Sequence, residues 1–349
     1  MTEKTIAKSA VLMAVIVLAT VIGYETALRV KGMPISYDDN PALWANSRKD
    51  ALEDQQHSVV FVGSSRIKYD LDIPTWEAQT GMRAVQLAHV GSNPIPMLED
   101  LANDEHFKGN VVVDVTEPLF FSDLPFMFEK PAAGITYFHE RTLAQQASFE
   151  INRLVESQLV FLDKDNFSMN ARIDRLFIPN RPGVFGPPIF PEEFAMTQFD
   201  RQTCMTDRFA HDTSQVNVVR GIWAGMLKAK MGPPLTDAQI DAIVRNVKKS
   251  TDRIKARGGK VVFVRTPSSG PFLQGETMGF PRARYWDKLL RMTGCQGVHF
   301  QDHASMSNLP CPEFSHLDQS DAKKYTIGLA SVLQQMQWIP GQKRLLTNL

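Results

Sequence analysis

The chain has 349 residues, of which 43% are hydrophobic and 22% are charged, a composition that supports a large folded core. Its 38 lysine and arginine residues balance its 38 aspartate and glutamate residues, so the formal net charge is zero. Without a net positive field the chain has no general attraction for nucleic acid, and no nucleic-acid partner is expected.

The three cysteines match no zinc-binding spacing and are too few for a disulfide framework. We therefore expect neither a metal site nor a cofactor. In an oxidising compartment a bridge between Cys295 and Cys311 is one prediction, and three unpaired thiols, with Cys204 as the third, is the equally weighted alternative.

The N-terminal segment predicts a membrane anchor. The run from Ala10 to Tyr24 carries no charge, and Ile6 to Val30 is suited to one helix. A bilayer needs about 20 apolar residues, and the stem of a snorkelling Lys8 lengthens the run. Lys4 and Lys8 precede it, which favours a cytoplasmic N-terminus with the rest of the chain exported. A cleaved signal peptide is the alternative, but no small-x-small cleavage site follows the run, so residues 1–30 are expected to form a single-pass anchor.

Five short apolar runs bounded by turn residues predict strands that are covered on both faces, as in a parallel sheet. Helices are predicted between them, and this alternation is typical of a doubly wound α/β sheet. The predicted strands are 59–62, 84–87, 111–113, 261–264 and 298–300, and the predicted helices are 40–55, 74–79, 95–103, 236–256, 282–292 and 319–338. We therefore expect a three-layer α/β/α sandwich around a five-stranded, mainly parallel sheet.

The regular alternation breaks between residues 120 and 234. This stretch predicts a helix over 142–161, a proline- and glycine-rich loop over 179–191 and a further helix over 214–230. We interpret it as an insertion, after the third strand, in a single domain of residues 31–349. It is either a lid or substrate-binding cap, or a helical extension that only enlarges the core.

Small hydroxyl, glycine and titratable residues follow the predicted strands, and ligands of doubly wound sheets gather at these carboxyl ends. The segments are Gly63-Ser64-Ser65-Arg66, His89–Asn93, Asp114–Glu117, Arg265–Gly270 and Asp302-His303. Arg66 is a candidate for binding an anionic sugar or donor, and a solvated arginine is the simpler alternative. Arg265 and Ser268 are candidates for lining the pocket, unless their segment is an ordinary turn.

A second pattern indicates nucleophilic catalysis. A serine hydroxyl attacks only when a histidine takes its proton, and the histidine needs an acid that orients it. Ser64-Ser65 follows the first strand, and Glu313-Phe314-Ser315-His316-Leu317 precedes the last helix, so one turn holds an acid three residues before a histidine. The spacing predicts a serine, His316 and Glu313 as the catalytic set. The alternative residues are Asp318 and Asp302 as the acid and His303 as the base.

Residues 58–117 and 259–333 resemble the SGNH (GDSL-like) hydrolase superfamily. Gly63-Ser64-Ser65 occupies the place of its Gly-Asp-Ser turn, with Ser64 instead of the aspartate, and Glu313 to Leu317 matches its Asp-x-x-His-Leu block. The resemblance implies a flavodoxin-like fold, Ser65 as the nucleophile, His316 as the general base and Glu313 as the orienting acid.

The same resemblance implies an oxyanion hole. Gly91 matches the glycine whose amide contributes after the second strand. The third family block, Gly-x-Asn-Asp, has no counterpart in Val115-Thr116-Glu117-Pro118, and Asn93 or Thr116 is expected to replace its asparagine. Losing one such donor typically costs about 10²–10³ in rate.

With its anchor, the chain is similar to the exported branch of that superfamily that handles cell-envelope polymers, including the alginate acetylation proteins and the D-alanyl-transfer protein of teichoic acid assembly. This implies an inner (cytoplasmic) membrane protein whose domain faces the periplasm or extracytoplasmic side. It would transfer an O-acyl (acetyl) group from an acyl donor to a polysaccharide through an acyl-serine. The similarity also implies a membrane-bound O-acyltransferase as a partner. A simple esterase or deacetylase and a non-catalytic glycan-binding or scaffold module are the alternatives.

Overall fold

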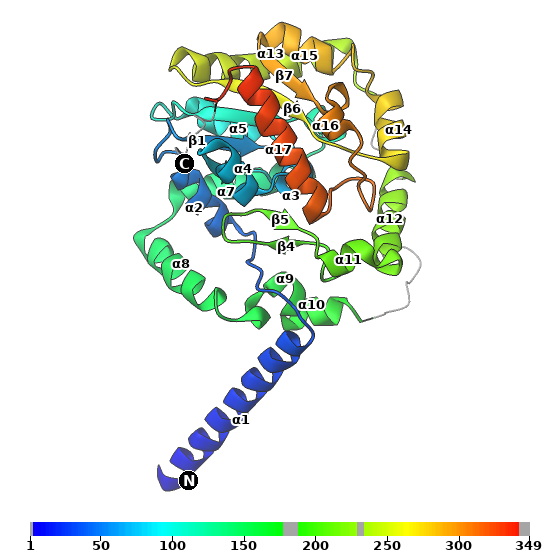
Figure 1. Cartoon of the computed structure of the whole chain (residues 1–349). Helices are drawn as coiled ribbons and strands as arrows, with labels where there is room; N and C mark the ends of the chain where they lie inside the picture. The colour runs from blue at the N-terminus through cyan, green and yellow to red at the C-terminus, as the bar shows by residue number, and fades with distance from the viewer. Residues whose placement is uncertain (1–2, 177–187, 229–233, 342–349) are drawn as a thin grey trace, which may run out of the picture.

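The computed structural model describes residues 3–176, 188–228 and 234–341 (Figure 1). Most of the predicted loop over 179–191 lies outside the described residues, as does the end of the predicted helix over 214–230.

A five-stranded sheet lies at the centre of the domain, and every neighbouring pair of its strands is parallel. The strands are β1 (Ser58–Val62), β2 (Arg83–Gln86), β3 (Asn110–Asp114), β6 (Val261–Arg265) and β7 (Gln296–His299), in the order β2-β1-β3-β6-β7. Counted along the chain this is the order 2-1-3-4-5, which flavodoxin-like doubly wound sheets share. The five predicted strands are confirmed.

Helices cover both faces of the sheet because alternate side chains of each strand point to opposite sides. Val60 and Val62 of β1 enter one core, and Val59 and Phe61 enter the other. The first core is covered by α2 (Pro41–Asp50), α5 (Ile95–Asn103), α7 (Phe126–Glu140), α13 (Asp237–Ala256) and α15 (Trp286–Thr293). The second is covered by α3 (Ser65–Asp70), α4 (Ile73–Thr80), α16 (Ala304–Ser307) and α17 (Gln319–Gln335). The predicted three-layer arrangement is therefore present.

The two cores also decide the state of the cysteines. Cys295 is buried in the core that α13 covers and Cys311 in the core that α17 covers, on the other side of the sheet. All three cysteines are free, so the predicted bridge is not formed.

The stretch between β3 and α13 is mostly helical, as predicted, and it has two parts. Its first long helix, α7, packs on the core: Gly134 lies so close to Trp44 that an added Cβ would come within 2.9 Å of the indole. The remaining elements lie on the side of the domain from which the N-terminal helix leaves (Figure 1). They are α8 (Leu143–Glu156), η1 (Val160–Leu162), α9 (Lys164–Phe167), α10 (Met169–Asp174), β4 (Met196–Thr197), β5 (Thr203–Cys204), α11 (Asp207–His211) and α12 (Thr213–Lys228); the short α6 (Glu117–Phe120), before α7, buries Phe120 in the core.

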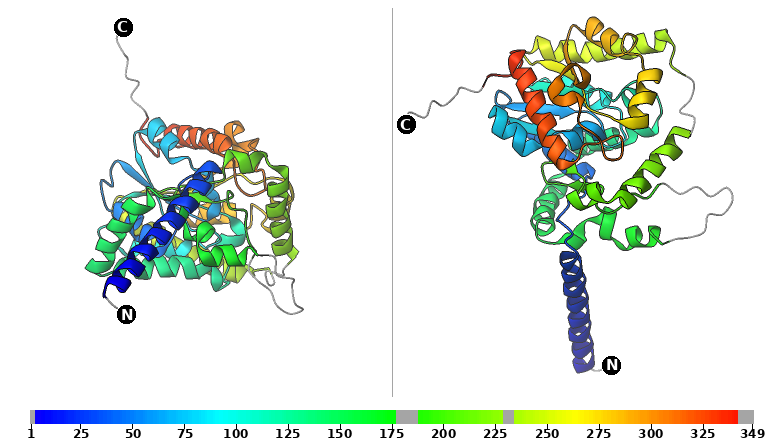
Figure 2. Two further views of the ribbon diagram at one scale, coloured as in Figure 1. Left: turned by 90° about the horizontal axis from the view of Figure 1, so that it is seen from below. Right: turned by 45° about the vertical axis from the view of Figure 1, so that its right-hand side comes forward.

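The N-terminal helix α1 (Glu3–Val30) projects away from the domain, as Figure 1 and the right-hand view of Figure 2 show. Its most apolar 18-residue window has a mean hydropathy of 2.3 and no buried residue. Among the described residues it is the one helix long and apolar enough to cross a membrane.

Candidate active site

Ser65 lies at the start of a helix, just after the end of the first strand. β1 ends at Val62, and the chain turns through Gly63 and Ser64 into α3, whose first residue is Ser65. Glycine is required in this turn, because a Cβ at Gly63 would come within 2.7 Å of the Asp114 Cβ on β3. The Ser65 side chain stays partly exposed, whereas Ser64 beside it is buried.

Ser65, His316 and Glu313 lie in the geometry of a serine–histidine–acid triad. His316 Nε2 is 2.8 Å from Ser65 Oγ, and His316 Nδ1 is 2.9 Å from Glu313 Oε1. The same Glu313 oxygen accepts the backbone N–H of His316 at 2.6 Å, which fixes the acid relative to the ring. An imidazole held in this way presents Nε2 as the acceptor of the serine proton. The structure thus brings together the three residues that the sequence predicts as catalytic.

Trp223 of α12 is a fourth member of this arrangement, and sequence reasoning missed it. Its indole Nε1–H donates to Glu313 Oε2, so both carboxylate oxygens are engaged. Arg220, one turn earlier, donates to the carbonyl of Pro312 at 3.0 Å through Nε. The insertion therefore holds the loop that carries the acid.

The loop between acid and base contains an unusual backbone conformation. Phe314 has a φ of 79°, a left-handed conformation that costs most residues about 1–2 kcal/mol. Its ring is held on two sides: the Arg220 guanidinium lies 4.5 Å from the ring centroid, and Gly270 leaves no room for a Cβ beside it. Contacts from outside the loop therefore stabilise the turn that places Glu313 within hydrogen-bond distance of His316.

Aromatic side chains surround the imidazole. The rings of Tyr69 and Phe194 lie 4.4 and 5.8 Å from the His316 ring, and the Tyr69 hydroxyl donates to the Phe194 carbonyl at 3.2 Å. Burial, together with the negative charge of Glu313, raises the pKa of Tyr69 well above its usual value. The phenol consequently stays protonated and serves as a wall of the site.

We expect Trp223→Phe to lower kcat about tenfold to 100-fold with little change in KM, because a hydrogen bond to a charged group contributes about 1.5–3 kcal/mol. Phenylalanine keeps the aromatic packing but removes the donor to Glu313. The control is Phe272→Leu, which alters a ring that touches Trp223 without bonding the acid. Equal losses of kcat in the two variants, or an equal fall in unfolding temperature, would assign Trp223 to packing alone.

Ser64 is not placed for attack. Its hydroxyl is buried and donates to Thr116 Oγ1 at 2.9 Å, and Thr116 in turn donates to Asp114 Oδ2 at 3.0 Å. Thr266 donates to the other oxygen of Asp114 at 3.0 Å. These bonds tie β1, β3 and β6 together under the site. Thr116, one of the two expected replacements for the missing oxyanion donor, is used within this network.

Asn93, the other expected replacement, is also engaged. Its side-chain amide donates to the carbonyls of Phe120 and Ser122 at 3.1 and 3.2 Å, and its oxygen accepts the Ile95 N–H at 2.9 Å. Both amide protons are used, so Asn93 holds two loops together and is no oxyanion donor in this structure. Gly91 lies in an exposed turn with a φ of 63°, and its role as an oxyanion donor stays a prediction.

The expected binding residues Arg66, Arg265 and Ser268 lie in a buried ion-pair network and not on a substrate-facing surface. Both guanidiniums and the Ser268 hydroxyl contact Glu276 of α14 (Gly270–Gly279). Arg265 also donates to Glu117 at 3.1 Å. Burial raises the pKa of Glu276, but the two guanidiniums outweigh it and lower that pKa to about 2. Glu276 is therefore a charged core residue that the sequence pattern did not reveal.

The residues considered as alternatives for the catalytic acid and base make other contacts. Asp302 pairs with Arg282 at 2.7 Å, and Asp318 caps α17 by accepting the Asp321 N–H at 2.9 Å. His303 directly precedes the short helix α16, and its backbone carbonyl accepts the Met306 N–H at 2.9 Å. His89 is buried, and burial with the nearby Arg201 lowers its pKa well below the usual value.

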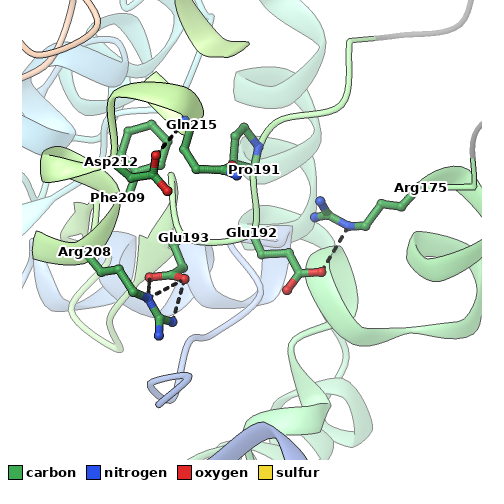
Figure 3. A pocket seen from close by; sticks show the side chains of 8 residues that line it. All are labelled: Arg175, Pro191, Glu192, Glu193, Arg208, Phe209, Asp212 and Gln215. Atoms are coloured by element: carbon green, nitrogen blue, oxygen red, sulfur yellow. Dashed lines mark hydrogen bonds and ion pairs between the residues drawn. The ribbon is translucent and has the colours of Figure 1, made fainter. Parts of the chain in front are cut away.

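A cavity of about 340 Å³ lies in the insertion, and no member of the triad lines it (Figure 3). Two ion pairs border it, Arg208 with Glu193 and Arg175 with Glu192. Its lining residues are Arg175, Pro191, Glu192, Glu193, Arg208, Phe209, Asp212 and Gln215. Among the described residues no cluster of three or more potential metal ligands occurs.

No protein-family model and no curated protein sequence matches the chain. The functional interpretation therefore depends on the geometry of Ser65, His316 and Glu313.

Proposed function

We propose that this chain is a membrane-tethered serine acyl-ester enzyme that transfers an O-acyl group, most simply acetyl, to a cell-envelope or exported polysaccharide. The observation that carries the proposal is the continuous set of contacts from Ser65 Oγ through His316 to Glu313. A buried acid, an oriented imidazole and a partly exposed hydroxyl are the groups that acyl transfer through a covalent intermediate needs.

The reaction has two halves. His316 Nε2 takes the Ser65 proton as Oγ bonds to the carbonyl carbon of the donor, and the imidazolium then protonates the departing donor oxygen. In the second half His316 takes the proton of a sugar hydroxyl, whose oxygen bonds to the acyl carbon. The bond to Ser65 Oγ breaks, and Oγ regains a proton from His316. Glu313 stabilises the imidazolium in both halves.

The location belongs to the same proposal. An apolar N-terminal helix preceded by Lys4 and Lys8 supports an inner-membrane anchor with the catalytic domain on the extracytoplasmic side. The resemblance to the cell-envelope branch of the SGNH superfamily extends the proposal to a membrane-bound O-acyltransferase as the partner that supplies the acyl group.

The test is to trap the acyl-enzyme. We expect the full-length chain, incubated with p-nitrophenyl acetate and quenched in acid, to carry an acetyl ester on Ser65, located by fragmentation of the peptide in a mass spectrometer. Adding an oligosaccharide should speed the loss of this ester and yield an acetylated sugar. Release of acetate alone would reassign the reaction as hydrolysis, and the absence of any acylated serine would contradict the proposal.

A further inference from the structure

The last turns of α1 are fixed to the insertion and do not form a free tether. Glu25 accepts the backbone N–H groups of Val160 and Phe161, each at 3.1 Å. Arg29 donates to Glu25 at 2.7 Å, and Leu28 is buried in a cluster with Met33, Val160 and Phe167. These contacts join the N-terminal helix to the insertion.

The helix α10 lies beside the point where the apolar part of α1 ends. The Tyr24 hydroxyl donates to the Phe167 carbonyl at 3.3 Å and accepts from Arg172 Nε at 3.1 Å. On this same helix Met169 and Ile173 are 75% and 48% exposed, and Leu176, just beyond it, is 64% exposed. Met169 and Ile173 are four residues apart and therefore lie on one side of α10. Leu176, three residues further on, extends this apolar side beyond the end of the helix.

The helix α8 is amphipathic, but most of its apolar side chains face away from the domain, whereas a surface helix usually turns them toward the core. Its Phe149 and Arg153 face the domain, where both contact the ring of Phe199. Its apolar side chains point outward: Ile151 and Leu154 are 64% and 65% exposed. Leu143 and Val155, 82% and 44% exposed, extend the same stripe. No residue of α8 is buried. A contiguous apolar side that faces outward marks a surface that contacts protein or membrane.

Both helices lie on the α1 side of the domain. Figure 1 shows α8 running across the direction of α1, with α9 and α10 above the end of α1, and Figure 2 shows the same end of the domain from below. If α1 crosses a bilayer up to about Tyr24, the exposed apolar side chains of α8 and α10 are held beside the surface from which α1 emerges.

Two arginines of α8 and α10 are paired with carboxylates and do not favour anionic lipid. Arg153 pairs with Glu150, and Arg172 pairs with Glu192. Paired arginines add little attraction for charged headgroups, so the expected attraction comes mainly from the burial of apolar side chains.

We propose that α8 and α10 form a membrane-docking collar around α1, which buries its exposed apolar side chains in the headgroup and acyl boundary of the same bilayer. The collar consists of Leu143, Ile151, Leu154, Val155, Met169, Ile173 and Leu176. The inference rests on the proposed membrane anchor. Because α1 is joined to the insertion, docking orders no additional segment and costs little conformational entropy.

The test uses the full-length chain in phosphatidylcholine vesicles, with single cysteines labelled by the polarity-sensitive dye NBD. The collar variants are Ile151→Cys, Leu154→Cys and Ile173→Cys. Asn152→Cys is the matched control on α8, and Ser331→Cys on α17 is the control on the far side of the sheet; both positions are exposed. The unsubstituted chain, with its three native cysteines, gives the labelling background. We expect several-fold weaker quenching by iodide, and stronger quenching by doxyl-labelled lipid, at the collar positions than at either control.

The outcomes separate the two proposals. If the chain floats with the vesicles but the collar dyes respond like the dye at Ser331, the collar is contradicted and the anchor stands. Dyes shielded from iodide but insensitive to doxyl lipid would show that protein, such as a second copy of this chain, covers the stripe. That result also contradicts the collar. If the chain does not float with the vesicles, both the membrane anchor and the membrane-docking collar are contradicted.

Discussion

Ser65→Ala is expected to lower the turnover of an acyl ester on the order of 10⁶-fold, the loss typical of removing the nucleophile from a triad. The reason is the contact of 2.8 Å between Ser65 Oγ and His316 Nε2, which no other serine shares among the described residues. The measurement is kcat with p-nitrophenyl acetate, together with covalent labelling by a fluorophosphonate probe, which should disappear.

Ser64→Ala is the matched control, because it removes the neighbouring hydroxyl from the same turn. Its loss should leave kcat within about tenfold of the parent, since one neutral hydrogen bond contributes about 0.5–1.5 kcal/mol. Labelling should persist. If labelling survives in Ser65→Ala and disappears in Ser64→Ala, Ser64 and not Ser65 is the nucleophile.

Glu313→Gln is expected to lower kcat on the order of 10⁴-fold while the chain stays folded, the effect typical of replacing the orienting acid by its amide. One carboxylate oxygen, Oε1, now accepts two N–H groups of His316, from the ring and from the backbone, and Oε2 accepts the Trp223 indole. An amide offers one oxygen and one NH₂ group, so either the imidazole or the indole faces a donor. The variant should keep its unfolding temperature within a few degrees while kcat falls.

Asp318→Asn and Asp302→Asn are the controls for the acid. Asparagine is as good a helix cap as aspartate at Asp318, and Asp302 takes part in an exposed ion pair with Arg282, which contributes about 0.2–1 kcal/mol. Both variants should keep kcat near that of the parent. A large loss in either, with a small one in Glu313→Gln, would move the acid to that position.

The sheet and the triad were predictable because their signals are local. Each strand is a short apolar run, and parallel strands bring their carboxyl ends to one edge, so Ser65 after β1 falls near the loop before α17. Glu313 and His316 are three residues apart on one turn. In each case neighbouring residues predict the local structure, and the parallel topology of the sheet then brings Ser65 close to Glu313 and His316.

The partners of these residues were not predictable, because they depend on contacts between distant segments. Asn93 has the residue type of an oxyanion donor, but the carbonyls of Phe120 and Ser122, about 30 residues later in the chain, accept from its amide. Arg66 and Arg265 have the residue type of substrate-binding arginines, but both are paired with Glu276, 210 residues from Arg66, and Arg265 also with Glu117. Trp223 lies 90 residues before the acid that it bonds.

Several helices were also missed, for reasons that composition explains. α3 has only six residues, too few for an apolar period. α7 contains Pro131 in its interior, and α14 begins and ends with glycine and has Pro271 in its first turn. Proline and glycine are the usual signals for turns, and here packing against the core outweighs them.

The contacts between α12 and the acid loop mean that this chain cannot be divided into a catalytic core and an interchangeable cap. A chain shortened to the five strands and their covering helices would keep Ser65 and His316. It would lose the indole that bonds Glu313 and the guanidinium that holds Phe314 in its left-handed turn. Substitutions in α12 and in residues 311–316 are therefore expected to arise in matched pairs among related chains, and a cap exchanged between two such enzymes would have to bring its own acid loop with it.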